Sequence, residues 1–388
     1  MLRSLYSGIS GLRSHQTMLD VTGNNIANVN TAGFKGSSVQ FQDTLSQLAQ
    51  GAGGPQADVG GTNPAQVGLG VQVAGISTNF AQGSAQSTGR ATDLMISGDG
   101  FFVTKLGGET LYTRAGAFDF DPQGRLVDPS GALVQGWGAV NGQIQDGGAV
   151  GTVTLPLGAI SPAIPTTSAT MGGNLPDDAA LGAELVRDLQ VFDQTGESQN
   201  LSLAFTRTAT GWDVNDGTGV AGTITFANGA LTSATTIGVN GGGVTLDVSK
   251  LTGFAALSTA AISGQDGRKA GTLESFTMSK DGTLVGSFSN GASQAVGRVS
   301  LATFVNPGGL EKAGSSSYRA TFNSGTAELG TPGTAGFGAI VAGALEMSNV
   351  DLSQEFTNLI VAQRGFQANA RIITTSDEVL QELTNLKR

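Results

Sequence analysis

The two ends of the chain carry apolar residues at helical spacing. Near the start, alternating gaps of four and three residues predict one helix face, formed by Leu5, Ile9, Leu12, Gln16, Leu19, Gly23 and Ile26. Near the end, a strict seven-residue repeat holds Leu352, Leu359, Phe366, Ile373 and Leu380. A second repeat, four residues after the first, holds Phe356, Gln363, Ala370, Asp377 and Thr384. This spacing is that of a coiled coil, so we expect the two ends to pair.

The first helix is expected to run from about Leu2 to the Asn24-Asn25 pair. It should be weak on its own, because Gly8 and Gly11 each cost about 1 kcal/mol relative to alanine inside a helix.

The last helix is expected to begin after Ser348 and Asn349, either of which could cap it, and to run towards Arg388. At about 1.5 Å per residue, some 35 residues make a rod on the order of 50 Å long. Such a rod exceeds the width of a small domain.

A helical hairpin packed on the core of its own subunit is the ordinary interpretation of these helices. Two observations weaken it: polar residues occupy part of the predicted faces, and the middle of the chain shows no long apolar surface that would cover such a rod. Apolar faces that one subunit cannot bury must fray or find neighbours. We therefore expect burial between subunits.

The middle of the chain carries strand and turn signals. Two D-P-x-G turns, at Asp121–Gly124 and Asp128–Gly131, predict a β-meander over residues 112–137. Hairpin turns are expected at Asn228-Gly229, Asp281-Gly282 and Asn290-Gly291. Residues 50–66 are rich in small side chains and are interpreted as a loop or extended arm.

These signals give an α+β, mainly β fold, in which paired terminal helices form a coiled-coil-like layer and two nested β-rich domains lie between them. The predicted divisions are a terminal helical domain at 1–28 and 349–388, a connecting arm at 29–69, a first β-domain at 70–141 and 271–348, and an inserted outer β-domain at 142–270.

Composition narrows the classes of partner. The 388 residues carry a formal net charge of -10, and no dense basic patch of the kind that binds phosphates is visible, so nucleic acid is not expected as a partner. The chain has no cysteine, which removes disulfides, thiolate metal sites and thiol nucleophiles. No apolar run approaches the roughly 18 residues of a spanning helix, so we expect no membrane insertion. The first residues do not form a Sec-type signal peptide.

Catalytic and cofactor motifs are weak. Gly217, Gly219 and Gly222 match G-x-G-x-x-G, but a strand rather than a helix is expected to follow, so they are interpreted as a loop. The run from Asp119 resembles the start of a calcium loop, yet its twelfth position is a serine where a glutamate is required, and a hairpin turn explains it better. The single histidine, His15, is interpreted as an exposed helix residue. We expect no enzyme activity, catalytic residue, cofactor or metal.

Four sequence blocks resemble the bacterial flagellar rod and hook axial protein family. They are NNIANVNTAGFK at 24–35, SGDGFFV at 97–103, the segment at 112–137, and GALEMSNVDLSQEFTNLIVAQRGFQANARIITTSDEVLQEL at 343–383. The matching signature positions are Asn24, Asn25, Asn28, Gly33, Phe34, Ser348, Asn349 and Asp351. The length, with its inserted middle domain, resembles the hook branch more than the shorter rod branch.

This resemblance implies a structural subunit. Hook subunits are exported by the flagellar type III apparatus without a cleaved signal, and they assemble outside the cell beneath a cap into a hollow, bendable tube that transmits motor torque to the filament. Terminal helices line the channel and β-domains form outer layers. The implied partners are further copies of the chain, the hook cap, the distal rod and the hook–filament junction proteins. Residues 45–68 are longer than the connector of some members.

The residue pattern supplies a mechanism for this assignment. Terminal faces left unsatisfied in one subunit should be largely unfolded before assembly and order when neighbours bury them. The residues of this expected assembly seam are Leu5, Ile9, Leu12, Leu19, Ile26, Leu352, Phe356, Leu359, Phe366, Ile373 and Leu380. The alternatives are a distal rod protein and, from another class, a secreted β-rich protein that binds or acts on glycans.

Overall fold

A computed structural model describes residues 2–55, 60–140, 142–156, 158 and 160–386. The chain divides into two compact units. The first comprises residues 1–156, 277–285 and 295–388, and the second comprises residues 157–276 and 286–294. The expected domain limits remain a proposal, but residues 143–156 lie in the first unit, because strands β12 (Gln143–Ile144) and β13 (Gly151–Thr152) pair with β11 (Leu133–Val140).

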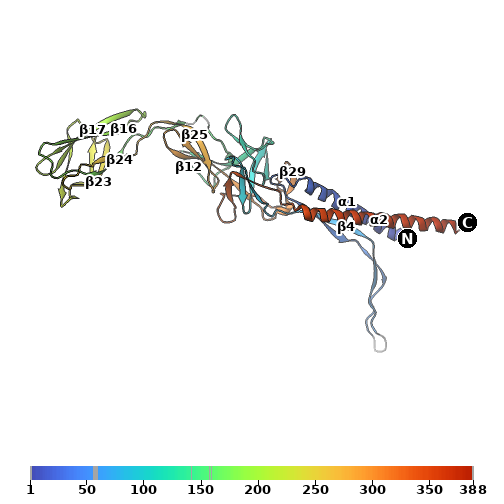
Figure 1. Ribbon diagram of the computed structural model, residues 1–388. Helices are drawn as coiled ribbons and strands as arrows, with labels where there is room; N and C mark the ends of the chain where they lie inside the picture. Colours follow the sequence, from blue (N-terminus) through green and yellow to red (C-terminus); the bar gives the residue numbers. More distant parts are fainter. Residues whose placement is uncertain (1, 56–59, 141, 157, 159, 387–388) are drawn as a thin grey trace. The chain divides into compact units, whose positions relative to one another are not determined.

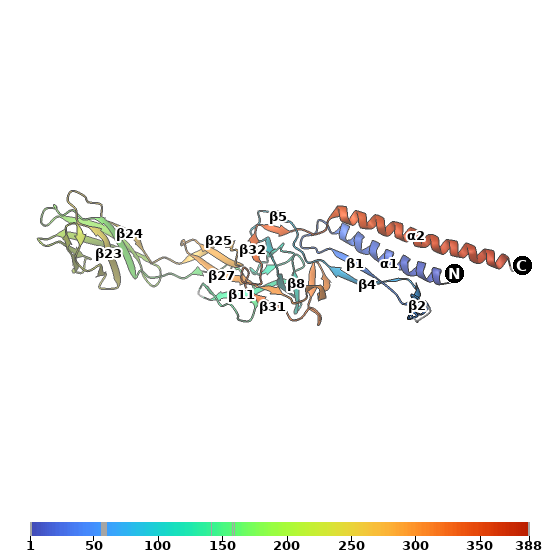
Figure 2. The same cartoon turned by 90° about the horizontal axis from the view of Figure 1, so that it is seen from below.

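The fold is α+β and mainly β, with one long helix at each end of the chain. Helix α1 (Leu2–Ala27) and helix α2 (Leu352–Asn385) lie side by side and run in opposite directions, as Figures 1 and 2 show. The prediction that Ser348 or Asn349 caps α2 is wrong. Asp351 is the N-cap, and its carboxylate accepts hydrogen bonds from the backbone N–H groups of Ser353 and Gln354 at 2.8 and 3.3 Å.

A long β-hairpin follows α1, and we call it the arm. Strand β1 (Ser37–Asp43) pairs with β4 (Val71–Thr78), and β2 (Ser46–Gln50) pairs with β3 (Ala65–Gly68). In Figure 1 the blue hairpin extends away from the helices. Of the two predicted forms of residues 50–66, a loop or an extended arm, the structure shows the arm, because the first and last of these residues lie in the paired strands β2 and β3. Residues 56–59 lie outside the described ones.

The arm also changes the expected start of the first β-domain. Residues 71–78 pair with the arm's first strand and contact α1, instead of joining the sheet of the first unit. The backbone N–H of Val71 donates to the Ser10 hydroxyl at 3.2 Å, which fixes the base of the arm to α1.

The β-structure of the first unit is a large, mostly antiparallel assembly. It contains the meander β9–β10–β11, whose two expected turns are closed by Gly124 N–H to Asp121 O at 2.8 Å and Gly131 N–H to Asp128 O at 2.9 Å. Its remaining strands and short helix are β5 (Ala85–Ser87), β6 (Leu94–Ser97), β7 (Phe101–Leu106), β8 (Glu109–Thr113), β9 (Asp119–Phe120), β10 (Leu126–Val127), β28 (Leu301–Thr303), η1 (Pro307–Gly309), β29 (Glu311–Gly314), β30 (Ser317–Arg319), β31 (Glu328–Gly330), β32 (Ala339–Ala342) and β33 (Ala344–Glu346).

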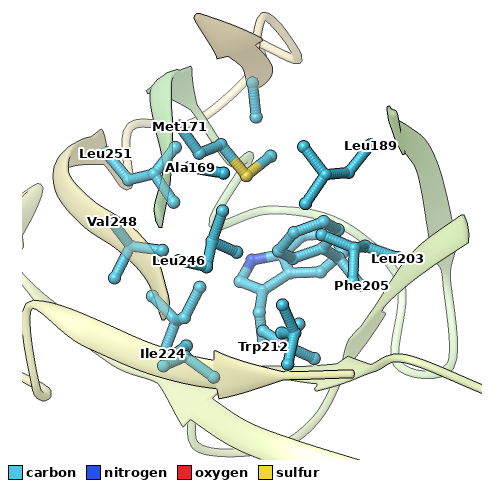
Figure 3. Packing of buried hydrophobic residues seen from close by; sticks show 14 of the residues in the cluster. Ala169, Met171, Leu189, Leu203, Phe205, Trp212, Ile224, Leu246, Val248 and Leu251 are labelled. Carbon is cyan, nitrogen blue, oxygen red and sulfur yellow. The ribbon is translucent and has the colours of Figure 1, made fainter. Parts of the chain in front are cut away.

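Two four-stranded sheets build the second unit, in the orders β22-β23-β15-β24 and β16-β17-β18-β19. Their inward side chains form one core, in which Trp212 and Phe205 from one sheet meet Met171 and Leu246 from the other (Figure 3). The bounds are β14 (Ile160–Ser161), β15 (Ser168–Asn174), β16 (Glu184–Phe192), β17 (Ser198–Arg207), β18 (Trp212–Asn215), β19 (Val220–Ile224), β20 (Phe226–Ala227), β21 (Ala230–Leu231), β22 (Thr236–Val239), β23 (Val244–Thr252) and β24 (Ala261–Gln265). Three strands contain residues of both units, namely β25 (Gly271–Met278), β26 (Thr283–Phe288) and β27 (Ser293–Val299).

The glycine motif in this second unit is a loop in its first part, as predicted, but its last glycine lies in a strand. Gly217 and Gly219 lie between β18 and β19, Gly222 lies within β19, and the next element is strand β20 rather than a helix. Asn228 and Gly229 form the expected hairpin turn between β20 and β21.

Candidate functional site

The contact between the two terminal helices is built on glycine. A Cβ atom at Gly11 would lie 2.8 Å from the Asn369 side chain, and one at Gly365 would lie 2.5 Å from the His15 ring. Around Gly8 the nearest atoms of α2 lie 3.5 Å from such a Cβ position. The glycines that weaken an isolated α1 are therefore the points at which the helices approach closely.

His15 differs from its prediction for the same reason. It is half-buried rather than exposed, because it packs on Gly365 and makes an edge-on contact with Phe41 of the arm, with ring centroids 5.8 Å apart. The imidazole therefore lies where α1, α2 and β1 meet.

The structure brings most of the predicted seam residues into this helix pair. Nine of them are half-buried, namely Leu5, Ile9, Leu12, Leu19, Ile26, Leu359, Phe366, Ile373 and Leu380. Leu352 and Phe356 are 39% and 50% exposed. One copy of the chain thus covers the seam only in part.

The second predicted repeat on α2 does not face α1. Gln363, Asp377 and Thr384 are exposed together with Phe356, and only Ala370 is half-buried. The residues that are covered beside the first repeat instead lie three positions after each of its members. They are Glu355, Ala362, Asn369 and Ser376. Ala362 is the one buried residue of α2. Small and polar side chains fit this side of the helix because the glycines of α1 bring the two backbones close together.

A stripe of apolar side chains on α2 remains exposed. Val361, Ile372, Val379 and Leu383 are 53%, 42%, 45% and 49% exposed, and their separations of eleven, seven and four residues place them on one side of the helix. We call this set the outer stripe. The sequence prediction missed it, although its spacing could have revealed it.

A buried ionic cluster lies where the helices join the sheet. Lys35 Nζ is 2.5 Å from Glu346 Oε1 and donates to Ala81 O at 2.8 Å, while Arg114 Nη1 lies 3.3 Å from Glu346 Oε2. All three charged side chains are 0–3% exposed. Burial lowers the pKa of Lys35, which its contact with Glu346 only partly offsets. We call these three residues the junction cluster.

The predicted signature residues surround this cluster. Asn25 accepts from Ser37 N–H at 3.0 Å and donates to Ser37 O at 2.7 Å and to Glu355 at 3.1 Å. Asn349 accepts from Gly36 N–H at 2.9 Å and donates to two carbonyl groups of residues 79 and 81.

Gly33 has a φ of +69°, and its N–H donates to Glu346 O at 2.7 Å. The Lys312 ammonium group lies 5.2 Å from the centre of the Phe34 ring.

Asn28 donates to Asn24 O at 2.9 Å at the end of α1, and Ser348 accepts from Val350 N–H at 3.3 Å before α2. The signature thus connects the root of both helices to the sheet.

Three family models match successive parts of the chain. The model described as flagella basal body rod protein matches residues 5–35, the flagellar hook protein FlgE/F/G D1 domain matches residues 95–167, and the flagellar basal body rod FlgEFG protein C-terminal region matches residues 341–386. The chain is 41% identical to the flagellar hook protein FlgE of Borreliella burgdorferi and 39% identical to that of Treponema pallidum, with 100% of both chains covered in each comparison. The chain belongs to the flagellar hook and rod family, and it is a structural subunit of the flagellar hook.

A relative that is named as a rod protein limits what the middle insertion can tell about the branch of the family. The flagellar basal-body rod protein FlgG of Bacillus subtilis is 36% identical, with 100% of each chain covered. The middle insertion therefore does not by itself separate the two branches. Identity is higher to the two hook proteins. Among the described residues, neither long helix is apolar enough over its length to span a bilayer.

Proposed function

We propose that this chain polymerises through its terminal helices into a hollow, flexible tube that transmits torque from the flagellar motor to the filament. The outer stripe is the observation that carries this proposal. Four apolar side chains on one side of α2 stay about half exposed in a single copy. Completing their burial contributes roughly 1 kcal/mol each, because full burial of such a side chain is worth about 1.5–3 kcal/mol.

Each subunit that joins the polymer adds this burial free energy again. A contact between two different surfaces of the same chain generates a ring if its rotation closes and an open helical filament if it does not, and the proposed tube requires the second case. Leu352 and Phe356, which belong to the predicted seam but stay exposed, would complete their burial in the same way.

The arm supports the same proposal from a separate part of the chain. Every residue of β2 and β3 is exposed, and Leu45 and Leu48 are 82% and 56% exposed. Among the described residues, β2 and β3 form a two-stranded sheet, and an isolated two-stranded hairpin is at best marginally stable in water. Neighbouring subunits would supply the missing cover.

The junction cluster would carry load between the helices and the sheet. Removing one partner of a buried ion pair is strongly destabilising, so the three side chains hold the root of α1, the segment before α2 and the sheet in one arrangement. Flexibility of the tube would come from the Gly-, Ala-, Ser- and Thr-rich second unit, whose outer contacts could slide.

The cellular setting follows from the family. Export by the flagellar type III apparatus without a cleaved signal would bring the chain outside the cell. There it would meet the hook cap, the distal rod and the hook–filament junction proteins. Before assembly we expect the half-buried seam to exchange its amide hydrogens quickly, because one copy gives it limited cover.

Negative-stain electron microscopy of concentrated protein tests the proposal. The wild-type chain and the variant Gln363→Asp should form tubes, whereas Val361→Asp should not, because only the latter places a charge in the outer stripe. Both positions are exposed in a single copy, so neither change should unfold the monomer. Tubes from Val361→Asp, or none from the wild type under any condition, would refute the proposal.

A further inference from the structure

An aromatic pocket lies in the first unit, at some distance in sequence from the terminal helices. It has a volume of about 310 Å³ and is lined by Phe80, Phe101 and Phe304, with Arg114, Asp99 and Thr303 among its other residues. Phe101 makes edge-on contacts with Phe80 and Phe304, at centroid distances of 5.5 and 5.9 Å. The Arg114 side chain is 3% exposed, its Nε has no hydrogen-bond partner among the described residues, and its guanidinium carbon lies 5.4 Å from the centre of the Phe101 ring.

The chemistry of this pocket suits one more aromatic ring. Aromatic side chains favour edge-on neighbours, and an arginine cation is attracted to the electron-rich face of a ring. The volume is at the low end of the range for ligand pockets, about 300–1,000 Å³. A single side chain fits that size better than a peptide segment does.

A fully exposed phenylalanine lies on the same unit. Phe322 is 110% exposed and Val305 is 95% exposed, the two highest values among the large apolar residues of the described part of the chain. Residues 320–326 and 304–309 form a lobe joined by hydrogen bonds. Asn306 donates to Asn323 O at 2.9 Å, and the Thr321 hydroxyl donates to Gly309 O at 2.6 Å.

This lobe presents its phenylalanine in a fixed backbone. The Thr321 N–H donates to the Ser324 hydroxyl at 2.9 Å, and Ser324 itself is 0% exposed. Because the loop is already ordered, insertion of the ring would cost little further conformational entropy.

The aromatic pocket and the exposed Phe322 of the lobe are different surfaces of one chain. Phe304 is 9% exposed in the pocket wall, whereas the next residue, Val305, lies in solvent on the lobe. A contact between two different patches is heterologous, and it can propagate from copy to copy as a polymer when its rotation does not close a ring. The flagellar axial family forms self-polymerising structures.

We propose that the Phe322 ring of one copy inserts into the aromatic pocket of a second copy of this chain. The inference rests on the proposed polymer and adds a contact that does not involve the terminal helices. In this contact, the charge of Arg114 in the pocket of one copy faces the incoming ring. Val305, on the lobe of the other copy, covers the rim of that pocket.

Cysteine cross-linking tests this contact cleanly, because the natural chain has no cysteine. Phe322→Cys and Thr303→Cys chains are mixed, assembled under reducing conditions and then oxidised. We expect a disulfide-linked dimer from this mixture and none from Thr303→Cys alone. A mixture of Thr303→Cys with Leu181→Cys is the matched control, because Leu181 is also an exposed apolar residue, at 73%.

A second measurement separates assembly from folding. Phe322→Ala should raise the critical concentration for tube formation about tenfold, as truncation of a buried aromatic anchor does, while leaving the urea midpoint of the monomer unchanged. Tubes without the cross-link, or an unchanged critical concentration, would overturn this contact and leave the helix-driven polymer standing. A wild-type chain that forms no polymer would overturn both.

Discussion

Gly33 offers a direct test of how tightly the helices are joined to the sheet. Its φ of +69° favours glycine, and a Cβ atom there would lie 2.4 Å from Ala115 N, 2.6 Å from Ala115 Cα and 2.7 Å from Arg114 C. These are backbone atoms, which cannot rotate away as the end of a side chain can. Gly89 is a matched control, because its φ is +71° and nothing lies within 4 Å of the equivalent Cβ position.

The expected losses of stability in the two variants separate backbone strain from steric overlap. Gly89→Ala should cost about 1–2 kcal/mol, the penalty for a left-handed backbone in an L-residue. Gly33→Ala carries the same penalty and adds about 1–3 kcal/mol for overpacking. It also displaces the Gly33 N–H to Glu346 O hydrogen bond, which is worth about 1 kcal/mol. These three contributions add up to roughly 3–6 kcal/mol.

Urea unfolding followed by tryptophan fluorescence measures the difference. Trp137 is 5% exposed and lies in the first unit, whereas Trp212 belongs to the second, so a Trp212→Phe background reports the first unit alone. With a slope of about 3 kcal/mol per molar urea, Gly33→Ala should lower the midpoint by about 1–2 M and Gly89→Ala by about 0.3–0.7 M. Equal shifts in the two variants would show that residue 33 is not packed tightly against the backbone of residues 114 and 115, which follow β8.

Three further outcomes are expected. Gly23→Ala has open space around its Cβ and should stabilise α1 by about 0.5–1 kcal/mol in a thermal melt followed by circular dichroism. Gly11→Ala should stabilise α1 less, because its Cβ must displace the end of the Asn369 side chain, 2.8 Å away, whose amide donates to Gly365 O at 2.9 Å. Glu346→Gln should cost about 3–5 kcal/mol in the same urea assay of the first unit, because it leaves two buried cations without their carboxylate. The pKa of Asp216 is lowered to about 2, first by the hydrogen bond from the Thr218 hydroxyl, so its stabilisation is complete above about pH 4 and is lost as the pH falls through 2. The urea midpoints of wild type and Asp216→Asn, measured by Trp212 fluorescence, should therefore differ strongly at pH 6 and become nearly equal at pH 2.

The sequence by itself determined the features that local patterns encode. A repeat of seven residues specifies a helix and one of its faces, so the two terminal helices and the half-buried row from Leu359 to Leu380 followed from it. The D-P-x-G turns at Asp121 and Asp128 followed likewise, because a type I turn depends on four adjacent residues.

The tertiary structure decided everything that depends on a distant partner. Whether the side chains three or four residues after Leu359 face α1 depends on where α1 lies, and in the structure Ala362 is buried whereas Gln363 is exposed. Lys35 and Glu346 are 311 residues apart, and no local spacing links them. The arm's pairing, the close contact at Gly33 and the pocket around Phe101 have the same character: each is a contact between segments that the chain brings together only after folding, and local propensity carries no information about it.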